Sequence, residues 1–444
     1  MRPTLVRLHR WFGLVIAGFL VMAGLTGSLL AWNHELEAWL APELFVAPPA
    51  GPGPALDPLE LRARVQAAYP GTFVARAPLQ VEPGRTLVFR LYALPPPGGG
   101  KAPGLAADQV FVNPWTGRLQ GERLWGDIGQ GLKNLMPFVL RLHDSLALDL
   151  VGRYLMGAAA LLWTLDCFAG AWLTLPPRAS RGGGPSWLSR WRPAWAVRWR
   201  AGAHKLSFDL HRAGGLWPWA MLFVLAWSSV AFNLREVYEP VMRTLFVHQL
   251  DERPQPLARP LLRPPVDWAA ARAIGRARLA ETAAGRGFAV LGEYMLIYDP
   301  RIGRYSYYAR SSLDVSERWG ITRIDVDART GEMTGRWLPT AGAAGDTVRT
   351  WLMTLHMAAV GGAADAGLRQ RAGPGHRHAR RHRRADLAEE TPGGRGAPPA
   401  RPPVADPVPG ALSAAGPRGV TVIRTRSSRP RSSGRRRAWR RRRS

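Results

Sequence analysis

The sequence has almost no cysteine. Its single residue, Cys167, lies inside an apolar run, so the chain has no internal disulfide and no iron–sulfur cluster held by four cysteines. A glycine-rich dinucleotide-binding motif after a strand and a phosphate-binding Walker loop are absent as well. If this protein transfers electrons, its own carrier must therefore be of another kind.

Acidic residues are scarce toward the C-terminus. Residues 363–444 contain 21 Arg against 5 acidic residues and supply +16 of the net charge of +28. This tail explains why the mean hydropathy is only −0.13 although the chain has 19 Trp and several long apolar runs. Without the tail, the composition is that of a basic membrane protein with attached soluble parts.

Three long segments have few or no charged residues. Residues 11–32 are uncharged over 22 positions, enough to cross a hydrocarbon core of about 30 Å at about 1.5 Å per residue. Residues 154–175 contain Asp166 as their only charge, and residues 214–233 are uncharged, with Pro218 expected to kink the first turns. The sequence therefore predicts three spanning helices.

The arginines predict how these helices are oriented. Arg2, Arg7 and Arg10 precede the first span, and the basic loop 176–210 contains Asp209 as its only acid, so both belong on the cytoplasmic side. A cleaved signal peptide is the alternative for the N-terminal run. However, the run is longer than a usual signal core, and its Leu-His-Arg motif recurs inside the chain, at residues 210–212.

The basic loop is also rich in tryptophan. Four Trp recur every fourth residue between positions 187 and 199, which favours one interfacial helix lying on anionic lipid. We interpret His204 and His248 as loop residues.

Two soluble segments, 33–136 and 234–350, should each form an α+β unit on the outer side of the membrane. The first predicts a helix over 57–69, capped by Asp57 and with Glu60 bonding back, strands at 85–94 and 108–112, and a turn at 113–117. The second predicts a helix over 267–284, strands at 294–298, 305–309 and 322–326, and a turn at 327–331.

The two halves share landmarks at one period. His9 and His211 are 202 residues apart, Gly117 and Gly331 are 214 apart, and His143 and His356 are 213 apart. An internal duplication explains this agreement. Each half would then contain a histidine, a span, a soluble unit, a second histidine and a second span.

These four histidines are the candidate site. The predicted topology pairs His9 with His211 at the cytoplasmic edge and His143 with His356 at the outer edge. Neutral imidazole binds iron strongly, so each pair would fill both axial positions of a haem b, giving two haems. The alternative is that the histidines are only interfacial side chains. His34 is a possible substitute ligand near the outer edge.

Asp166 is a second candidate, because an acid inside a span is costly unless it has a function or a partner. We therefore interpret it as a possible functional acid. The alternative is a protonated side chain that is hydrogen-bonded to a neighbouring helix.

The sequence divides as follows: residues 1–32, N-terminal segment and first span; 33–136, first soluble domain; 137–175, outer approach helix and second span; 176–210, basic cytoplasmic loop; 211–233, third span; 234–350, second soluble domain; 351–362, start of a fourth span; 363–444, the Arg- and Pro-rich tail. The repeat requires a fourth span after His356, but the apolar run stops near Gly362. Either the tail is a genuine basic, disordered segment, or the reading frame changes there, which we favour.

Several motifs together resemble one known family. These are Leu-His-Arg-Trp-Phe-Gly at 8–13, the turns Phe-Val-Asn-Pro-Trp-Thr-Gly at 111–117 and Asp-Val-Asp-Ala-Arg-Thr-Gly at 325–331, and Asp-Cys-Phe-Ala-Gly-Ala-Trp-Leu-Thr-Leu-Pro at 166–176. Over residues 1–362 the chain resembles the PepSY-associated transmembrane helix family, which includes bacterial inner-membrane proteins of iron uptake. The resemblance implies a four-span α-helical membrane bundle with two periplasmic PepSY-like domains. For the ferric-siderophore reductases of that family it also implies two haems, here held by His9, His211, His143 and His356.

The expected function is therefore that of an inner-membrane, haem-containing reductase, which passes electrons from an unidentified donor to a periplasmic ferric siderophore. Membrane lipid is the expected surrounding, and no nucleic-acid partner is expected, although the Arg tail would be the segment to bind one. The alternative is a non-catalytic membrane protein whose periplasmic domains bind a protein or peptide, such as a protease that they restrain.

Overall fold

The computed structural model describes residues 2–48, 53–94, 102–177, 185–249 and 254–360. Two helices in these ranges are long and apolar enough to cross a membrane, namely α1 (Arg2–Leu30) and α6 (Asp149–Thr174). The helices α8 (Ala203–Leu216) and α9 (Trp219–Asn233) pass the same test together, but they meet at an angle of 66°. The described chain thus has two candidate spans, or three if the bent pair is one span.

Pro218 explains the bend. Proline has no backbone N–H and its ring collides with the preceding turn, so a helix rarely continues through it undisturbed. The break between α8 and α9 confirms the predicted kink, and it is sharp enough to separate two helices. Because α8 begins at Ala203, part of the predicted loop 176–210 is helical. The prediction that His204 lies in a loop is wrong for the same reason.

The Trp-rich segment does not form the single helix that its spacing predicts. A short helix α7 (Trp187–Trp191) is followed by the 3-10 turn η3 (Arg192–Trp195), and Trp199 is not helical. Pro193 explains the change, because it cannot supply the N–H that would extend α7. Trp191 still packs against both Trp187 and Trp195, with 5.1 Å between ring centroids in each case.

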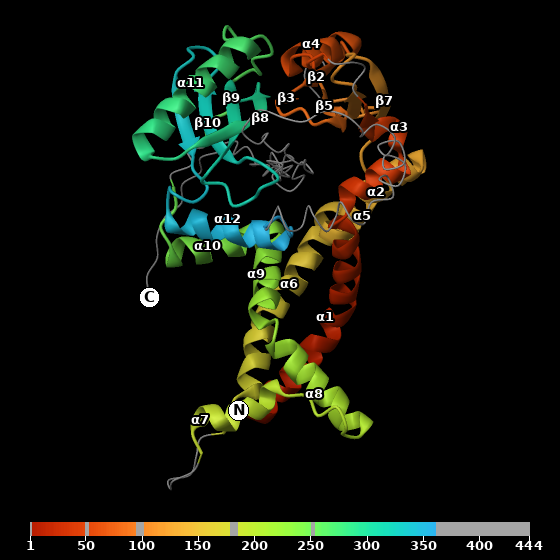
Figure 1. The fold of residues 1–444 in the computed structure, drawn as a ribbon, viewed down its shortest axis with the longest axis vertical. Helices are drawn as coiled ribbons and strands as arrows, with labels where there is room; N and C mark the ends of the chain where they lie inside the picture. The colour runs from red at the N-terminus through yellow and green to blue at the C-terminus, as the bar shows by residue number, and fades with distance from the viewer. Residues whose placement is uncertain (1, 49–52, 95–101, 178–184, 250–253, 361–444) are drawn as a thin grey trace, which may run out of the picture. The chain divides into compact units, whose positions relative to one another are not determined.

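The spanning helices pack side by side. Helix α1 contacts α6 and the shorter α5 (Leu135–Ser145), and α6 contacts α9 (Figure 1). Helix α12 (Ala344–His356) packs on α9 beside α10 (Arg235–Leu245). We call the end where α1 begins the amino end, and the end where α1 leads into the sheets the sheet end.

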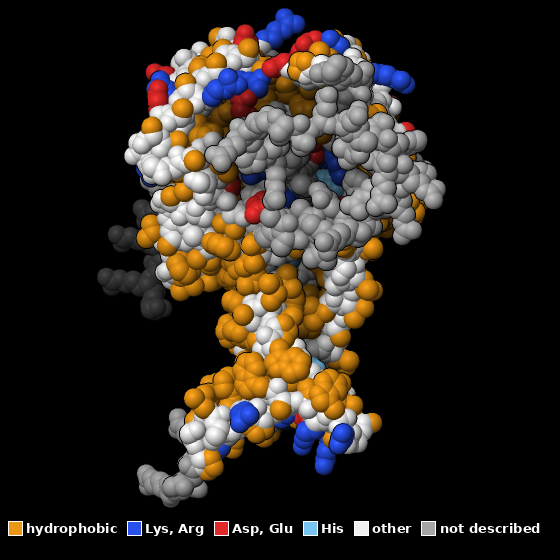
Figure 2. Space-filling view, viewed as in Figure 1, with side chains coloured by type: hydrophobic (Ala, Val, Ile, Leu, Met, Phe, Trp, Pro, Cys, Tyr) orange, Lys and Arg blue, Asp and Glu red, His pale blue; other side chains and the backbone are white. Residues whose placement is uncertain are grey.

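The outer faces of these helices are apolar. On α1, large side chains such as Leu14, Val21 and Leu25 are more than 60% exposed, as expected of a helix that faces lipid. Figure 2 shows hydrophobic side chains over much of the visible surface of the helices, with Lys and Arg gathered at the end that carries α8. The inner contact between α6 and α9 uses a small cluster that includes Ala160 and Val230.

The first sheet is antiparallel with the order β2-β5-β6-β7. Its strands are β2 (Thr72–Val74), β5 (Leu87–Ala93), β6 (Gln109–Val112) and β7 (Leu119–Arg123). Helix α4 (Pro58–Ala68) covers it and buries Leu61 and Val65 against Phe89 and Val110. Both predicted strands and the predicted helix of this segment are present.

The N-terminus of α4 is capped as predicted by Asp57, whose carboxylate accepts a hydrogen bond from the backbone N–H of Leu59 at 2.7 Å. Glu60 does not complete the predicted capping box. It pairs with Arg64 one turn later, at 2.6 Å between Oε1 and Nη2.

The second sheet has the order β11-β10-β9-β8-β3 and is also antiparallel. Its strands are β8 (Val290–Asp299), β9 (Arg304–Ser311), β10 (Thr322–Asp327), β11 (Met333–Trp337) and β3 (Arg76–Pro78). Helix α11 (Trp268–Arg286) packs on it through Ala271 and Leu279, against Tyr307 and Ile324. All elements predicted for this segment are found, but β3 comes from the first segment.

The two soluble segments are therefore joined. Strand β3 pairs with β8, so that Ala77 faces Leu296 across the ladder. Arg272 of α11 forms an ion pair with the α4 cap Asp57, at 2.7 Å between Nη1 and Oδ2. The guanidinium of Arg62 in turn lies 3.7 Å from the ring centroid of Trp268.

Short elements complete the described chain. They are α2 (Asn33–Leu40), α3 (Pro42–Phe45), β1 (Val46–Ala47), β4 (Gly84–Arg85), η1 (Ile128–Gln130) and η2 (Leu132–Asn134). Helix α12 ends at His356 and the described chain ends at residue 360. The rest of the predicted fourth span, and the tail 363–444, lie outside the described residues, and the predicted duplication stays a prediction.

Candidate cofactor-binding site

The structure brings His9 and His211 together at the amino end. His9 lies on α1 and His211 on α8, and their ring centroids are 6.0 Å apart with the ring planes inclined by 56°. The two residues are 202 positions apart in the sequence, so this proximity is a property of the fold. His9 is partly buried, whereas His211 is exposed in the described chain.

Asp166 of α6 reaches His9. Its Oδ1 lies 2.7 Å from Nδ1 of the histidine, and the residue is 7% exposed. The two side chains come from neighbouring helices, and which of them donates the hydrogen bond depends on the tautomer of His9. Asp166 thus faces a neighbouring helix and not lipid. Both predicted roles, a functional acid and a protonated side chain that is hydrogen-bonded to a neighbouring helix, remain predictions.

An ion cluster anchors the part of α8 that bears His211. Asp209 is fully buried and accepts hydrogen bonds from Arg198 at 2.6 Å and from Arg212 at 2.8 Å. Arg198 belongs to the segment before α8, so the cluster ties that segment to the turn that bears His211. Within the described residues, no hydrogen bond or ion pair is formed by His211 itself.

The second pair lies at the sheet end. His143 is on α5 and His356 on α12, and their ring centroids are 6.2 Å apart with planes inclined by 68°. The ring of Phe232 packs against His356, with 5.2 Å between centroids. The four histidines therefore lie together in the predicted pairs. Their role as ligands stays a prediction.

Two hydroxyl groups orient the sheet-end histidines. Thr26 of α1 lies 2.9 Å from Nδ1 of His143, and Ser228 of α9 lies 2.7 Å from Nδ1 of His356. Each hydroxyl also donates to the carbonyl four residues earlier in its own helix, at 2.7 Å from Thr26 and 2.5 Å from Ser228. Because that proton is already used, the hydroxyl oxygen accepts from Nδ1–H and leaves Nε2 available.

Sequence reasoning missed both hydroxyls, although a signal was present. Thr26 follows His9 by 17 residues, and Ser228 follows His211 by the same 17. A small hydroxyl at equal distance from each Leu-His-Arg motif is the repeated feature that would have predicted them.

Two glycines allow the close approach of neighbouring helices. A Cβ atom on Gly27 would lie 3.2 Å from Cε1 of His143, and one on Gly170 would lie 3.2 Å from Cε1 of His9. Either contact is tighter than a normal van der Waals distance, so the histidine would have to shift. Each pair thus has one ring packed directly against the backbone of a span.

Burial favours the neutral form of the sheet-end histidines. It lowers the pKa of His143 below its ordinary value, and, with the nearby His143 adding to the effect, it lowers the pKa of His356 to about 4. Neutral imidazole is the form that binds a metal ion.

The spacing of both pairs agrees with a metal ion between the rings. With metal–nitrogen bonds of about 2 Å on each side, two opposed imidazoles have ring centroids about 6 Å apart. In three of the four rings Nδ1 has a hydrogen-bond partner on another helix. Histidines that bind a metal through Nε2 usually have such a partner at Nδ1. No group of three or more His, Cys, Asp or Glu side chains in the described ranges is placed to hold a metal ion by itself.

His34 is engaged elsewhere. Its Nδ1 accepts a hydrogen bond from Arg85 at 3.2 Å, and burial, with the positive charges of Arg85 and Arg318, lowers the pKa of His34 to about 3. This contact with the first soluble segment does not support the prediction that His34 could replace one of the outer-edge histidines as a ligand.

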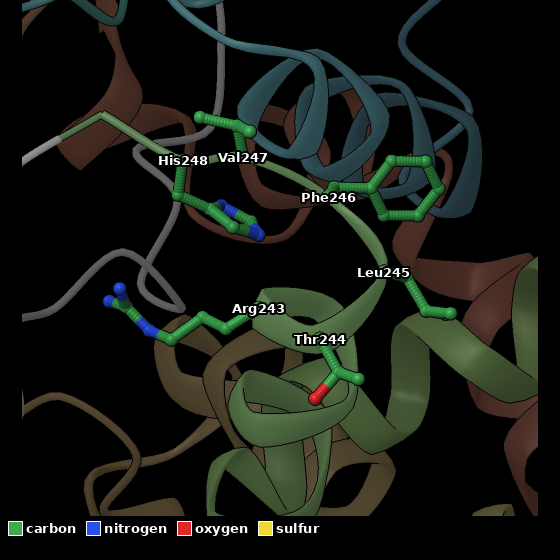
Figure 3. Close-up of a pocket in the computed structure, with 6 residues that line it drawn as sticks. All are labelled: Arg243, Thr244, Leu245, Phe246, Val247 and His248. Atoms are coloured by element: carbon green, nitrogen blue, oxygen red, sulfur yellow. The ribbon is translucent and has the colours of Figure 1, made fainter.

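A surface pocket of about 340 Å³ is lined by residues Arg243 to His248, which are the last residues of α10 and the segment that follows it. In Figure 3 the side chain of Arg243 extends beneath His248, whereas Thr244 points away from both. His248 is not helical, as predicted, and Nδ1 of its ring is 3.0 Å from Oδ1 of the buried Asp346. None of the four paired histidines lines this pocket.

Comparison with known proteins gives one family. The model of the PepSY-associated TM region matches residues 6–368, which include both histidine pairs, Asp166 and both sheets. No curated protein matches the chain.

Proposed function

The chain belongs to the family of the PepSY-associated transmembrane region, and on this premise we propose that it is a haem-containing electron-transfer protein that reduces a ferric siderophore. Membrane location and PepSY character follow from the family, whereas the haem, the substrate and the orientation are part of this proposal.

The observation that carries the proposal is the geometry of the two histidine pairs. Each pair has ring centroids about 6 Å apart, and in three of the four rings Nδ1 lies within hydrogen-bond distance of a side chain on a neighbouring helix. Interfacial side chains that merely contact lipid head groups have no need of this arrangement. His9 and His211 would hold one haem b, and His143 and His356 the other.

A haem with both axial positions filled carries single electrons and leaves no open position for oxygen. Burial favours the neutral form of His143 and His356, and the hydroxyls of Thr26 and Ser228 would fix the orientation of these two rings. Thr26, which contacts His143, stands 17 residues after His9 on the continuous helix α1, and this separation corresponds to about 26 Å along the helix axis. The two sites would therefore lie near opposite faces of a hydrocarbon core of about 30 Å.

The charge distribution supports an amino end in the cytoplasm. Arg2, Arg7 and Arg10 stand at that end of α1, and Arg190, Arg198 and Arg212 stand on or beside α7 and α8. The two sheets would then lie in the periplasm of a bacterial inner membrane. A ferric complex would be reduced at the sheet end, and reduction weakens binding of iron by hard oxygen ligands. The electron donor would be a separate molecule, because the sequence has no nicotinamide-binding motif.

An optical spectrum of the purified full chain tests the haem. Sharp reduced α and β bands are expected, and each change of His9, His143, His211 or His356 to Ala should remove part of the signal. His248→Ala is the control, because His248 pairs with Asp346 and lies in neither pair. A colourless wild-type protein would overturn the proposal and leave the partner-binding alternative.

A reduction assay tests the substrate. Membrane vesicles that contain the protein and a chemical electron donor inside should convert an external ferric hydroxamate to ferrous iron, which a ferrous-specific chelator reports. His143→Ala should abolish the reaction. A red protein that reduces no ferric complex in this assay would retain the electron-transfer part and exclude the proposed substrate.

A further inference from the structure

The two histidine pairs differ in the charge of their hydrogen-bond partners. At the amino end, Nδ1 of His9 faces the carboxylate of Asp166 at 2.7 Å. At the sheet end, the corresponding partners are the neutral hydroxyls of Thr26 and Ser228. Of the three side chains that contact an Nδ1 atom of the four histidines, Asp166 is the only one with an acidic group.

The charge of Asp166 acts with little screening. The residue is 7% exposed, so little water reaches its carboxyl group. In the part of the chain that the structure describes, His9 is its only hydrogen-bonding or ion-pairing partner. A carboxylate that accepts a hydrogen bond from Nδ1–H makes the imidazole a stronger electron donor. It therefore favours the more positive, oxidised state of a metal bound to that imidazole.

From this asymmetry we infer that Asp166 is a positioning residue that lowers the reduction potential of the amino-end haem below that of the sheet-end haem. The inference rests on the proposed function. It gives electron transfer a direction, because an electron that enters at the amino end moves downhill toward the sheets. In that step one iron is oxidised from ferrous to ferric, the other is reduced from ferric to ferrous, and no bond or proton is exchanged.

A purely structural role predicts something different. If Asp166 only joins α6 to α1, its removal would lower stability or haem content at both sites and leave the potential of any retained haem unchanged. The reduction potential is therefore the measurement that separates the two roles.

The experiment is a spectroscopic redox titration of the full chain in detergent or nanodiscs. Two components are expected in the wild type. Asp166→Asn keeps an oxygen that accepts from Nδ1–H and removes the charge, so it should raise the midpoint of the lower component and leave the other unchanged. A midpoint that does not move, or a shift only in the higher component, would refute the inference.

A matched control lies on the same helix. Asp149 stands at the other end of α6, its side chain is 68% exposed, and it pairs with Arg141 at 3.3 Å. Asp149→Asn changes the same charge and should move neither midpoint. A shift equal to that of Asp166→Asn would mean that only the overall charge of the protein matters, which contradicts the inference.

A second measurement does not depend on how well Asp166→Asn folds. His9→Ala should remove the lower-potential component and His143→Ala the higher one. If His9→Ala removes the higher component instead, the inference fails although the haems are present. If the wild type holds no haem, the proposed function itself fails, so the two failures are distinguishable.

Discussion

The two histidine pairs reach nearly the same ring spacing, 6.0 Å and 6.2 Å, through different parts of the fold. The amino-end pair is carried by α1 and α8, which belong to the candidate spans. The sheet-end pair is carried by α5 and α12, which are the first α-helices after the last strands of the two soluble segments. A change in the sheets can therefore reach the second pair through these helices, whereas the first pair depends on the packing of the spans.

The pairs also differ in burial. Burial lowers the pKa of both sheet-end histidines, whereas His211 of the amino-end pair is exposed in the described chain. Helix α6 follows His143 in the chain and supplies Asp166 to His9. The predicted repeat would place the fourth span against His211 in the same way, but that span falls outside the described residues. The comparison teaches that equal spacing does not imply an equal environment.

The largest expected effect comes from removing one ring of a pair. His9→Ala and His211→Ala should each abolish the same spectral component, and His143→Ala and His356→Ala should each abolish the other, which removes about half of the α-band absorbance in every case. Reduced-minus-oxidised spectra measure this. If His9→Ala and His143→Ala removed the same component, the pairing by ends would be wrong.

A smaller effect is expected from the hydroxyl groups. Thr26→Val and Ser228→Ala each remove the acceptor for Nδ1–H and should weaken haem retention at the sheet end on the order of tenfold. The amino-end component should be unaffected. The haem that remains bound after incubation with an excess of a haem-free, haem-binding protein measures the loss. Ser229→Ala is the neighbouring control, since the hydroxyl of Ser229 donates to the carbonyl of Leu225 and contacts neither histidine in the described residues.

A smaller loss of haem affinity is expected when the glycines that lie against His143 and His9 are replaced. Gly27→Ala forces His143 to shift by a few tenths of an ångström, so a loss of haem affinity on the order of a fewfold is expected at the sheet end alone. Gly170→Ala should do the same at the amino end alone. Gly24→Ala is the control in α1, because its added Cβ would meet no atom within 4 Å. Equal effects of Gly24→Ala and Gly27→Ala would contradict the contact.

The smallest spectral effect is expected at His34. His34→Gln should leave both spectral components unchanged, because His34 pairs with Arg85 and with neither haem site. Its effect should appear in the dependence of stability on pH. The pKa of His34 is lowered to about 3 in the folded chain from about 6.5 when unfolded, so the unfolded chain binds more protons between these values.

Stability should therefore decrease as the pH falls from about 6.5 to about 3, and His34→Gln should make this decrease shallower. Thermal unfolding across this pH range measures the slope. Loss of a haem component in His34→Gln would show instead that His34 is a ligand and that the sheet-end pair is assigned incorrectly.

Local signals allowed much of the fold to be predicted. Asp57 was recognisable as a helix cap, and it accepts the expected backbone hydrogen bond. The two turns that contain Gly117 and Gly331 have glycine at positive φ, 70° and 77°, as their sequences require. Strand β3, by contrast, has three residues and gains its pairing only from β8, so no local pattern could have assigned it to the second sheet.

The sequence by itself determined the apolar lengths of the spans, the break at Pro218, the main helix and several strands of each soluble segment, and the choice of the four histidines, because each depends on composition or on neighbours within a few residues. Only the tertiary structure decided which side chains complete each pair. Asp166, Thr26 and Ser228 meet their histidines across 117 to 157 residues of chain. Such contacts depend on how whole helices pack, and helix packing is set by the shapes of the surfaces that meet, which no local stretch of sequence contains.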